Sequence, residues 1–337
     1  MTQKQRIDAF VALGERLTYD NEKMKTLLQQ ASIKNPWYTT ENTKKQILAL
    51  SSNLTVEKLT QWLAPYPDID TDKVVGLILA GNIPLVGFHD ILCVLLAGFR
   101  AQIKLSSDDA GLTAFVLDEL IRIEPAFSGK IQLVERLQQY DLIIATGSDN
   151  SSRYFDYYFG KKPNIIRKNR NSVGVLTGTE SPAQLKALGS DIFDYFGLGC
   201  RSVSKLYIPK GYDVRQFFEA IESFQHIKEH YKYTNNYDYN KSIYLINGDK
   251  HLDNGFLLLK EDTRLASPLA TVFYEEYEQI ADVTSQLEAQ ADKIQCIVTQ
   301  ATIETSIPTF PLGGSQYPAL TDYADGVDVL AFLFNKK

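Results

Sequence analysis

Cys200 is the residue best suited to covalent chemistry in this 337-residue sequence. It ends the link Gly197-Leu198-Gly199-Cys200, between a predicted helix and a predicted strand. A thiol in such a link can point into a cleft, and a nearby cation or helix N-terminus would make it a nucleophilic thiolate. On this stretch alone, a buried thiol that packs as a small hydrophobic group is an equally good interpretation.

The other two cysteines, Cys93 and Cys296, fit structural roles better. Cys93 lies in an apolar helical stretch and Cys296 in a predicted strand. The three cysteines are far apart and show neither a CxxC pair nor a Cys/His ligand spacing, so we expect no disulfide framework and no metal site. Cys200 is therefore predicted to be the only essential cysteine.

Three predicted strands end in turns whose residues could bind a ligand. These turns contain Asn82, then Lys104, Ser106 and Ser107, and finally Gly147 and Ser148. The carboxyl ends of parallel strands meet at one edge of a sheet, where open α/β folds bind their ligands. The sequence therefore predicts a ligand site made by these turns.

Alternating strands and helices position these turns. Residues 1 to about 70 have helical patterns, with caps at Thr40 and Thr55. Buried-type strands then follow at 74–79, 101–104, 131–134 and 141–145, separated by helices that include 109–123. This alternation predicts a doubly wound parallel sheet.

A second run of elements surrounds Cys200. Helices are predicted from Ser181 to Gly197 and over 213–230, and the tyrosine-rich stretch 231–239 is interpreted as a loop. The apolar tail 327–334 is interpreted as an edge strand that could pair with another subunit. Strands are predicted at 165–166, 173–176, 203–208, 243–246, 270–273 and 294–298.

Composition excludes several classes of function. The net charge of -6, without a basic patch, argues against nucleic-acid binding. The sequence contains no apolar run long enough to span a bilayer, and its first residues lack an apolar signal core. We therefore expect a cytoplasmic globular protein.

Taken in order, these segments resemble the aldehyde dehydrogenase superfamily, and within it the LuxC-type acyl-CoA reductases. The resemblance covers roughly residues 73–330, and each motif alone is weak. It implies an α/β fold with two doubly wound domains. The implied parts are an N-terminal helical segment (1–70), a dinucleotide-binding domain (71–165), a catalytic domain (166–310) and a C-terminal closure (311–337). The matching segments are GNIP, AGFRAQIKLSSDD, IATGS, FGLGCRSVSKLYIP, ASPLATVFYEEY and PLGGSQYPALTDYADG.

The resemblance also implies roles for single residues. Cys200 would take an acyl group as a thioester, and the Asn82 amide with the backbone N–H of Cys200 would stabilise the oxyanion. Lys104 would hold ribose hydroxyls or a phosphate. Gly147 and Ser148 would let a dinucleotide approach the backbone closely. Without the resemblance, an ordinary turn role is favoured for Asn82, and a surface or turn role explains Lys104, Gly147 and Ser148 as well.

The residue three positions after Lys104 predicts which cofactor is used. In the superfamily, a glutamate there can accept from the ribose 2′-hydroxyl and would repel a 2′-phosphate. Here the residue is Ser107, which is neutral and can donate. We therefore expect NADPH, with NADH left open because Asp108 could turn inward.

One departure from the family bears on the reaction. Hydrolytic members have a glutamate where this chain has the cationic link 167–171, RKNRN. Because water needs a general base to attack a thioester, we predict reduction of acyl-CoA to aldehyde, and the reverse reaction only with CoA. The link could attract CoA phosphates, although a solvated surface loop explains it as well. A second family glutamate is replaced near Arg264.

Other functions stay open at this point. The chain could be an ordinary aldehyde dehydrogenase that oxidises aldehydes to acids, or a catalytically inactive scaffold. A cysteine hydrolase or acyltransferase would need a histidine base near Cys200, supplied by His89, His226, His230 or His251. The expected partners are an acyl-CoA or another acyl thioester, and other copies of the chain in a homo-oligomer.

Overall fold

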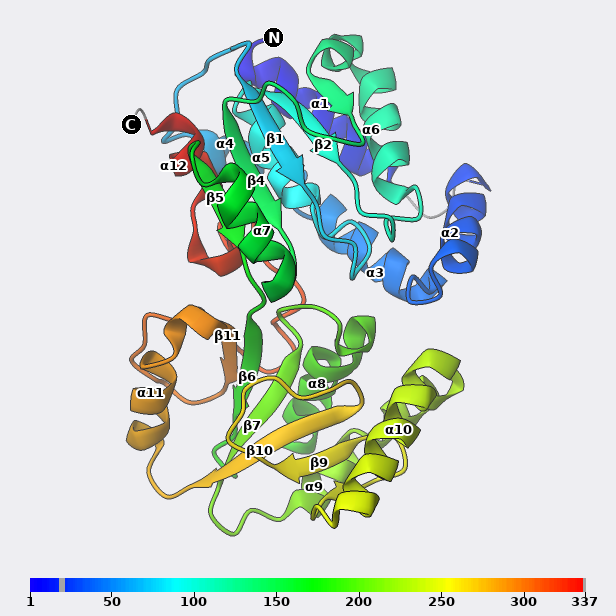
Figure 1. The fold of residues 1–337 in the computed structure, drawn as a ribbon, viewed down its shortest axis with the longest axis vertical. Coiled ribbons are helices and arrows are strands. Elements are labelled where there is room, and N and C mark those ends of the chain that lie inside the picture. The colour runs from blue at the N-terminus through cyan, green and yellow to red at the C-terminus, as the bar shows by residue number, and fades with distance from the viewer. Residues whose placement is uncertain (18–21, 336–337) are drawn as a thin grey trace. The chain divides into compact units, whose positions relative to one another are not determined.

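A computed structural model describes residues 1–17 and 22–335, and the chain divides into two compact units. Unit 1 lies within Met1–Asn169 and Ala319–Lys337, and unit 2 is Arg170–Pro318. Each unit has its own, mostly parallel sheet covered by helices (Figure 1). The predicted α/β fold with two doubly wound domains is confirmed. The chain enters unit 2 at Arg170, whereas the sequence placed this boundary at residue 166.

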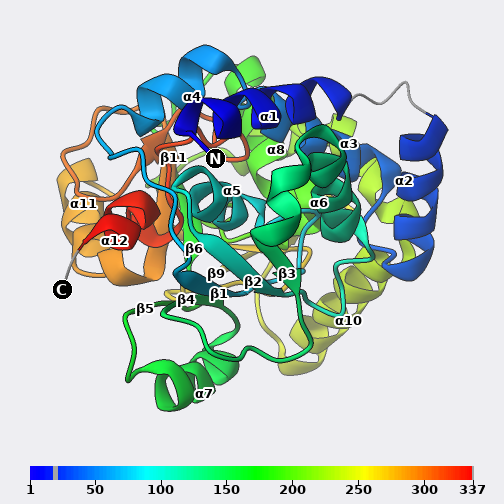
Figure 2. The same cartoon turned by 90° about the horizontal axis from the view of Figure 1, so that it is seen from above.

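The sheet of unit 1 has the strand order β3-β2-β1-β4-β5, and its strands are parallel. Helices α5 and α6 cover one face of the sheet, and α7 lies on the opposite face (Figure 2). The predicted strands are confirmed, and the helix predicted from residue 109 begins at Leu112. The elements are β1 (Val74–Ile78), α5 (Phe88–Leu96), β2 (Arg100–Lys104), α6 (Leu112–Ile123), β3 (Ile131–Leu133), β4 (Leu142–Thr146), α7 (Asp149–Phe159) and β5 (Asn164–Arg167).

The N-terminal helices share the core of this sheet. Ile7 and Phe10 of α1 are buried in one apolar cluster with Val75 of β1. Thr55 caps α4 as predicted, whereas the cap of α3 is Thr39 rather than Thr40. The helices are α1 (Gln3–Arg16), α2 (Glu22–Lys34), α3 (Thr40–Ser51) and α4 (Val56–Leu63).

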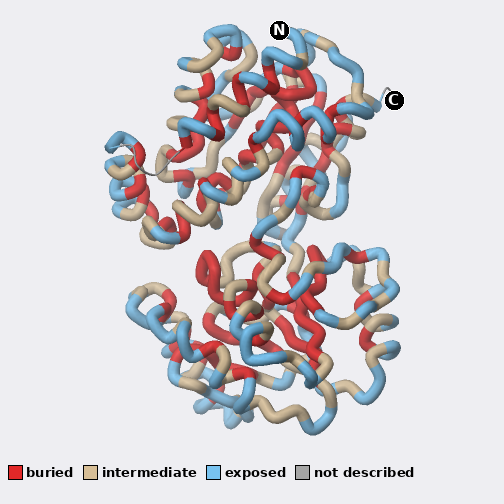
Figure 3. Tube along the Cα trace, turned by 180° about the vertical axis from the view of Figure 1, so that it is seen from behind, coloured by how far each residue is buried: buried red, intermediate tan, exposed pale blue. Residues whose placement is uncertain are grey.

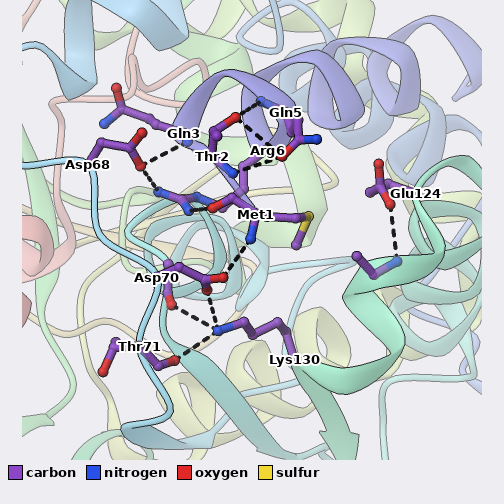
Figure 4. Close-up of polar contacts among 12 residues, drawn as sticks. Met1, Thr2, Gln3, Gln5, Arg6, Asp68, Asp70, Thr71, Glu124 and Lys130 are labelled. Atoms are coloured by element: carbon purple, nitrogen blue, oxygen red, sulfur yellow. Dashed lines mark hydrogen bonds and ion pairs between the residues drawn. The ribbon is translucent and has the colours of Figure 1, made fainter.

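Polar contacts also fasten α1 to unit 1. The buried Arg6 side chain donates to the Leu96 carbonyl at 2.9 Å and to the Asp68 carboxylate at 3.0 Å. Beside it, Asp70 pairs with Lys130 and with the N-terminal ammonium (Figure 4). A buried guanidinium without such partners would be strongly destabilising.

The sheet of unit 2 has the order β12-β11-β6-β7-β10-β9-β8 and is parallel except for the β8–β9 pair. Its central strands are buried, and the outer sides of its helices are exposed (Figure 3). The helix predicted over 213–230 divides into α9 and a 3-10 helix at Glu222–Glu229. The other elements are β6 (Asn171–Val175), α8 (Pro182–Phe193), β7 (Val203–Pro209), α9 (Val214–Ala220), β8 (Leu252–Asp253), β9 (Leu258–Glu261), β10 (Thr271–Tyr277), α11 (Ile280–Glu288), β11 (Ile294–Thr299) and β12 (Thr309–Phe310).

Helix α10 (Tyr231–Asn247) occupies the residues predicted as a loop at 231–239 and a strand at 243–246, so both predictions are wrong. Ile243 and Ile246, which indicated the strand, are 36% and 80% exposed. The buried face is made of tyrosines and one asparagine, so it lacks the apolar period by which helices are recognised. Its buried residues are Tyr233, Tyr237, Asn240 and Tyr244.

The predicted C-terminal edge strand is also wrong. Its residues form helix α12 (Val329–Phe334), which packs against α5 of unit 1. Val329 and Leu330 are fully buried there. Asp328 caps the helix, because its carboxylate accepts a hydrogen bond from the Ala331 amide at 2.9 Å. Val329, Leu330 and Leu333, which helped to indicate an oligomer contact, are therefore buried within unit 1, whereas Val327 is 38% exposed.

Candidate active site

The turns of unit 1 singled out by the sequence leave one edge of its sheet. Ile78 of β1 is the register partner of both Lys104 on β2 and Ala145 on β4. The strand order reverses between β1 and β4, which is where open α/β sheets bind ligands. The turns at this edge contain Asn82, Ser106, Ser107, Gly147 and Ser148.

The Asn82 turn and the Ser106 turn pack against each other through Gly81. A Cβ atom on Gly81 would lie 2.5 Å from Ser106 Oγ, which is too close for any larger residue. Asn82, Lys104 and Ser107 are exposed. The fold thus brings an amide, a cation and a hydroxyl to neighbouring strand ends, where their side chains can reach a bound molecule.

The other predicted residues of this edge have partners in their own turns. Ser106 Oγ accepts from the Asp108 amide at 3.2 Å. Ser148 Oγ caps α7 by accepting from the Ser151 amide at 3.3 Å. A Cβ on Gly147 would lie 2.7 Å from the Phe155 ring, so glycine lets α7 begin close to β4. Contact of these residues with a dinucleotide stays a prediction.

Two residues that the sequence did not indicate hold the Asn82 turn and the Ser106–Asp108 turn in place. The Tyr38 hydroxyl contacts the backbone on both sides of Asn82, and the Asn35 amide donates to the Asp108 carbonyl at 3.0 Å. Both residues stand in the short link between α2 and α3. No local pattern could have revealed them, because their partners are far away in the sequence.

In unit 2, a strained turn leads from α8 to the Cys200 link. Tyr195 and Phe196 have φ values of 54° and 60°, and Gly197 takes the predicted left-handed conformation at 76°. Residues other than glycine lose roughly 1–2 kcal/mol each in this region. Such strain is typical of functional turns that the surrounding structure holds in one geometry.

Cys200 itself is exposed, three positions before β7 begins at Val203. The Ser172 hydroxyl of β6 donates to the Cys200 carbonyl oxygen at 2.9 Å, and the Ser202 amide donates to the Gly199 carbonyl at 3.0 Å. The backbone that carries the thiol is thus fixed by a neighbouring strand and by its own turn. An exposed thiol on a fixed backbone is suited to react with a substrate.

The other cysteines are poorer nucleophiles. Cys93 and Cys296 are both 0% exposed. Burial raises the pKa of Cys296 to about 11, although Ser172 Oγ lies 3.1 Å from its sulfur. Burial also raises the pKa of Cys93, whose sulfur lies 3.8 Å from His89 Nδ1. Both groups are therefore neutral thiols near pH 7, which favours Cys200 as the reactive cysteine.

The glycine-rich segment near the C-terminus is anchored to the helix that precedes Cys200. Asp191 of α8 is fully buried and accepts from the Gly313 amide at 2.6 Å and the Ser315 amide at 3.0 Å. The Ser315 hydroxyl donates to the same carboxylate at 2.7 Å. A buried carboxylate needs several hydrogen-bond donors. Because the glycine turn supplies them, these bonds hold the turn against α8.

In the cationic link 167–171, Arg167 does not fit the interpretation as a solvated surface loop, whereas the next two residues do. Arg167 ends β5 and is 5% exposed, so it is neither a solvated surface residue nor able to reach the phosphates of a ligand in solution. It makes a two-bond ion pair with Asp90 of α5 and lies 3.5 Å from Thr146 Oγ1. Lys168 and Asn169 are exposed.

Each histidine contacts a backbone group. His89 Nε2 lies 2.9 Å from the Leu320 carbonyl, and His230 Nδ1 accepts from the Tyr233 amide at 3.4 Å. The Nδ1 atoms of the remaining two, His226 and His251, lie within 3.1 Å and 2.9 Å of backbone carbonyls. These backbone contacts explain the histidines as structural residues and give the hydrolase interpretation no support.

Within 1–17 and 22–335, no group of three or more His, Cys, Asp or Glu residues is placed to hold a metal ion. In the same part of the chain, no helix combines the length and the apolar character needed to cross a bilayer.

No protein-family model and no curated protein matches the sequence. Solved structures, however, share the fold. A benzaldehyde dehydrogenase from Corynebacterium glutamicum has a TM-score of 0.68 at 14% identity, covering 92% of this chain and 81% of that chain. An NADP-dependent enzyme from E. coli has a TM-score of 0.68 at 14% identity, covering 93% of this chain and 78% of that chain.

A third structure with this fold was solved with a cofactor. It is betaine aldehyde dehydrogenase from Staphylococcus aureus in complex with NAD+, with a TM-score of 0.65 at 13% identity, covering 92% of this chain and 75% of that chain. Similarity at this level of identity establishes the fold alone. The chain therefore has the aldehyde dehydrogenase fold.

Proposed function

We propose that this chain is an oxidoreductase that reduces an acyl thioester, most simply an acyl-CoA, to an aldehyde through an acyl-Cys200 intermediate. One combination of features in an aldehyde dehydrogenase fold carries the proposal. The Cys200 thiol is exposed, and the buried cation Arg167 stands in the segment where the family resemblance calls for a water-activating glutamate. The first feature supports a thioester, and the second argues against its hydrolysis.

The first proposed step transfers the acyl group to the protein. The Cys200 thiolate attacks the carbonyl carbon of the thioester and forms a new carbon–sulfur bond. The tetrahedral oxyanion accepts hydrogen bonds from the Asn82 amide and from the backbone N–H of Cys200. Its collapse breaks the bond to the CoA sulfur, which takes a proton and leaves as the thiol.

A nicotinamide dinucleotide, when bound, supplies a hydride to the acyl carbon. The named NAD+ complex among the structural neighbours supports this class of cofactor. The exposed Lys104 and Ser107 provide a cation and a donor for a ribose or phosphate group, and the neutral Ser107 favours NADPH. Asn82 again holds the oxyanion, and Cys200 departs as the thiolate when the aldehyde carbonyl forms.

Oxidation of an aldehyde to an acid is the second candidate, because named aldehyde dehydrogenases have this fold. Both candidates use Cys200 and a nicotinamide cofactor. They differ in whether water or the CoA thiol attacks the acyl-Cys200 thioester. Hydrolysis needs a base for water, a contribution of order 10²–10⁴ in rate, whereas CoA brings its own accessible thiolate. The link 167–171 has no carboxylate where the family resemblance calls for one, and this favours the thiol.

The test supplies acyl-CoAs of increasing chain length with NADPH and follows its absorbance. We expect aldehyde, free CoA and NADP+ in equal amounts, with no reaction in Cys200→Ala. A folded protein that reduces no acyl-CoA with NADPH or NADH, yet oxidises aldehydes to acids, would replace this proposal by the second candidate.

A further inference from the structure

We propose that Tyr38 is a positioning residue for Asn82. Its hydroxyl holds the backbone on both sides of Asn82 and so sets the direction of the amide that is to meet the oxyanion. This inference rests on the proposed role of Asn82 and extends it to a residue of the N-terminal helical segment.

The geometry of the contact is specific. Tyr38 Oη lies 2.9 Å from the Gly81 carbonyl oxygen and 3.1 Å from the Ile83 carbonyl oxygen. These are the two carbonyls that flank Asn82, and one hydroxyl proton is shared between them. The Tyr38 side chain is 1% exposed, so water cannot take over this bond when the hydroxyl is removed.

The hydroxyl serves as a donor over the whole working range of pH. Burial, with the nearby carboxylates of Asp109 and Asp108, raises the pKa of Tyr38 well above its ordinary value. Tyr38 therefore stays protonated, as a residue that holds the turn by donating a hydrogen bond must. Its function is to hold the turn, and that makes it separable from the chemistry of Cys200.

The turn that Tyr38 holds is strained. Leu85, which precedes α5, has a φ of 53°, a backbone conformation that is unfavourable for residues other than glycine. Gly81 leaves no room for a side chain, since an added Cβ would lie 2.5 Å from Ser106 Oγ. A strained turn relaxes when a brace is lost, and a displacement of about 1 Å at a catalytic group can lower the rate by about 100-fold.

A neighbour in the same link provides a matched comparison. The Asn35 amide donates to the Asp108 carbonyl at 3.0 Å and so holds the Ser106–Asp108 turn, proposed to bind the cofactor ribose. Tyr38→Phe should therefore lower kcat about tenfold and leave the Kd for NADPH unchanged. Asn35→Ala should weaken NADPH binding severalfold and leave kcat at saturation unchanged. A misfolded link would not give these opposite effects.

A double-mutant cycle separates positioning from a general structural role. In the Asn82→Ala background, where the amide is already absent, Tyr38→Phe should lower kcat no further. Tyr66→Phe is the control, since it removes a hydroxyl that donates to Asp328 at 2.7 Å in the same unit, and it should leave kcat and the cycle unaffected. An equal loss of kcat from Tyr38→Phe in both backgrounds would overturn the proposal.

A measurement without turnover keeps this test independent of the proposed reaction. Hydrogen exchange of the amides between Gly81 and Phe88 should be faster in Tyr38→Phe than in the parent, with Tyr66→Phe unchanged. Unaltered exchange there would contradict the positioning role, whatever the enzyme does. A parent that reduces no acyl-CoA would instead count against the proposed function alone, and the kinetic cycle would then be run on aldehyde oxidation.

Discussion

Arg167 and Asp90 form a buried ion pair that joins the end of β5 to the first turn of α5. The guanidinium makes two bonds to the carboxylate, one at 2.9 Å, and each side chain is 6% exposed. Burial alone would lower the pKa of Arg167, but the Asp90 carboxylate outweighs this and raises the pKa. In the segment where the family resemblance calls for a glutamate, Arg167 is therefore a permanent cation whose two terminal nitrogens pair with Asp90.

Breaking this pair should destabilise unit 1 strongly. Arg167→Met leaves the Asp90 charge buried and alone, at a cost of about 3–5 kcal/mol, whereas the double variant Asp90→Leu/Arg167→Met should recover most of that loss. Denaturant unfolding measures both, with Lys168→Met as the control because Lys168 is 61% exposed. A single variant as stable as this control would show that the pair contributes little.

Among the cysteines, Cys200 should react first. Burial raises the pKa of Cys296 to about 11, so this thiol is almost entirely neutral at pH 7, and burial also blocks the access of reagents to it. Incubation with acyl-CoA without dinucleotide, followed by mass spectrometry of the peptides, should place the acyl adduct on Cys200. An adduct on Cys93 or Cys296, or full activity in Cys200→Ala, would contradict the assignment.

The preference for NADPH should depend on Ser107. Ser107→Glu places a carboxylate where a 2′-phosphate would lie, so we expect it to weaken NADPH binding by at least tenfold and to spare NADH. Titration with both dinucleotides measures the ratio, and Asp108→Asn is the companion variant. If the parent bound NADH more tightly than NADPH, and Asp108→Asn removed this preference, Asp108 rather than Ser107 would face the ribose.

Acid should weaken the attachment of the N-terminal helices through Asp70. Burial alone would raise the pKa of Asp70, but its ion pairs with Lys130 and the N-terminal ammonium lower it. A carboxyl group with a lowered pKa in the folded state stabilises above its unfolded pKa of about 4, and this stabilisation is lost as the pH falls below that value. The stability difference between parent and Asp70→Asn should therefore shrink between pH 6 and pH 3.

The control for this measurement is Asp72→Asn, because Asp72 is 95% exposed. Its stability should differ little from that of the parent at either pH. A difference for Asp70→Asn that stays constant from pH 6 to pH 3 would show that the ion pairs of Asp70 do not govern the acid response.

Regular patterns made much of the fold predictable from the sequence. The apolar run at β1 and the glycine that closes α5 are local signals, and so is the glycine-flanked link at Cys200. The order of such segments then indicated the fold. Helix α10 shows where this approach fails, because Tyr233 and Tyr237 bury their rings while their hydroxyls bond to Phe256 and Asp253. Because these side chains carry polar hydroxyls, the buried face of α10 does not appear as an apolar pattern in the sequence.

The supports of the candidate site could not be predicted, because they are contacts between distant residues. Tyr38 contacts carbonyls more than forty positions away, and Arg167 of β5 pairs with Asp90 of α5, which lies 77 positions earlier in the sequence. A basic stretch such as 167–171 has the same composition whether it is solvated or paired inside the fold. Only the three-dimensional structure distinguishes the two cases, and here it corrects the interpretation of Arg167.

The most direct test of the central claim supplies an aldehyde and oxidised dinucleotide, with and without CoA, and follows formation of the reduced dinucleotide. We predict sustained turnover with CoA, yielding acyl-CoA, and without CoA no more than one turnover, which leaves the acyl group on Cys200. Sustained turnover to free acid in the absence of CoA would show that a base activates water at the thioester, and it would contradict the assignment as an acyl-CoA reductase.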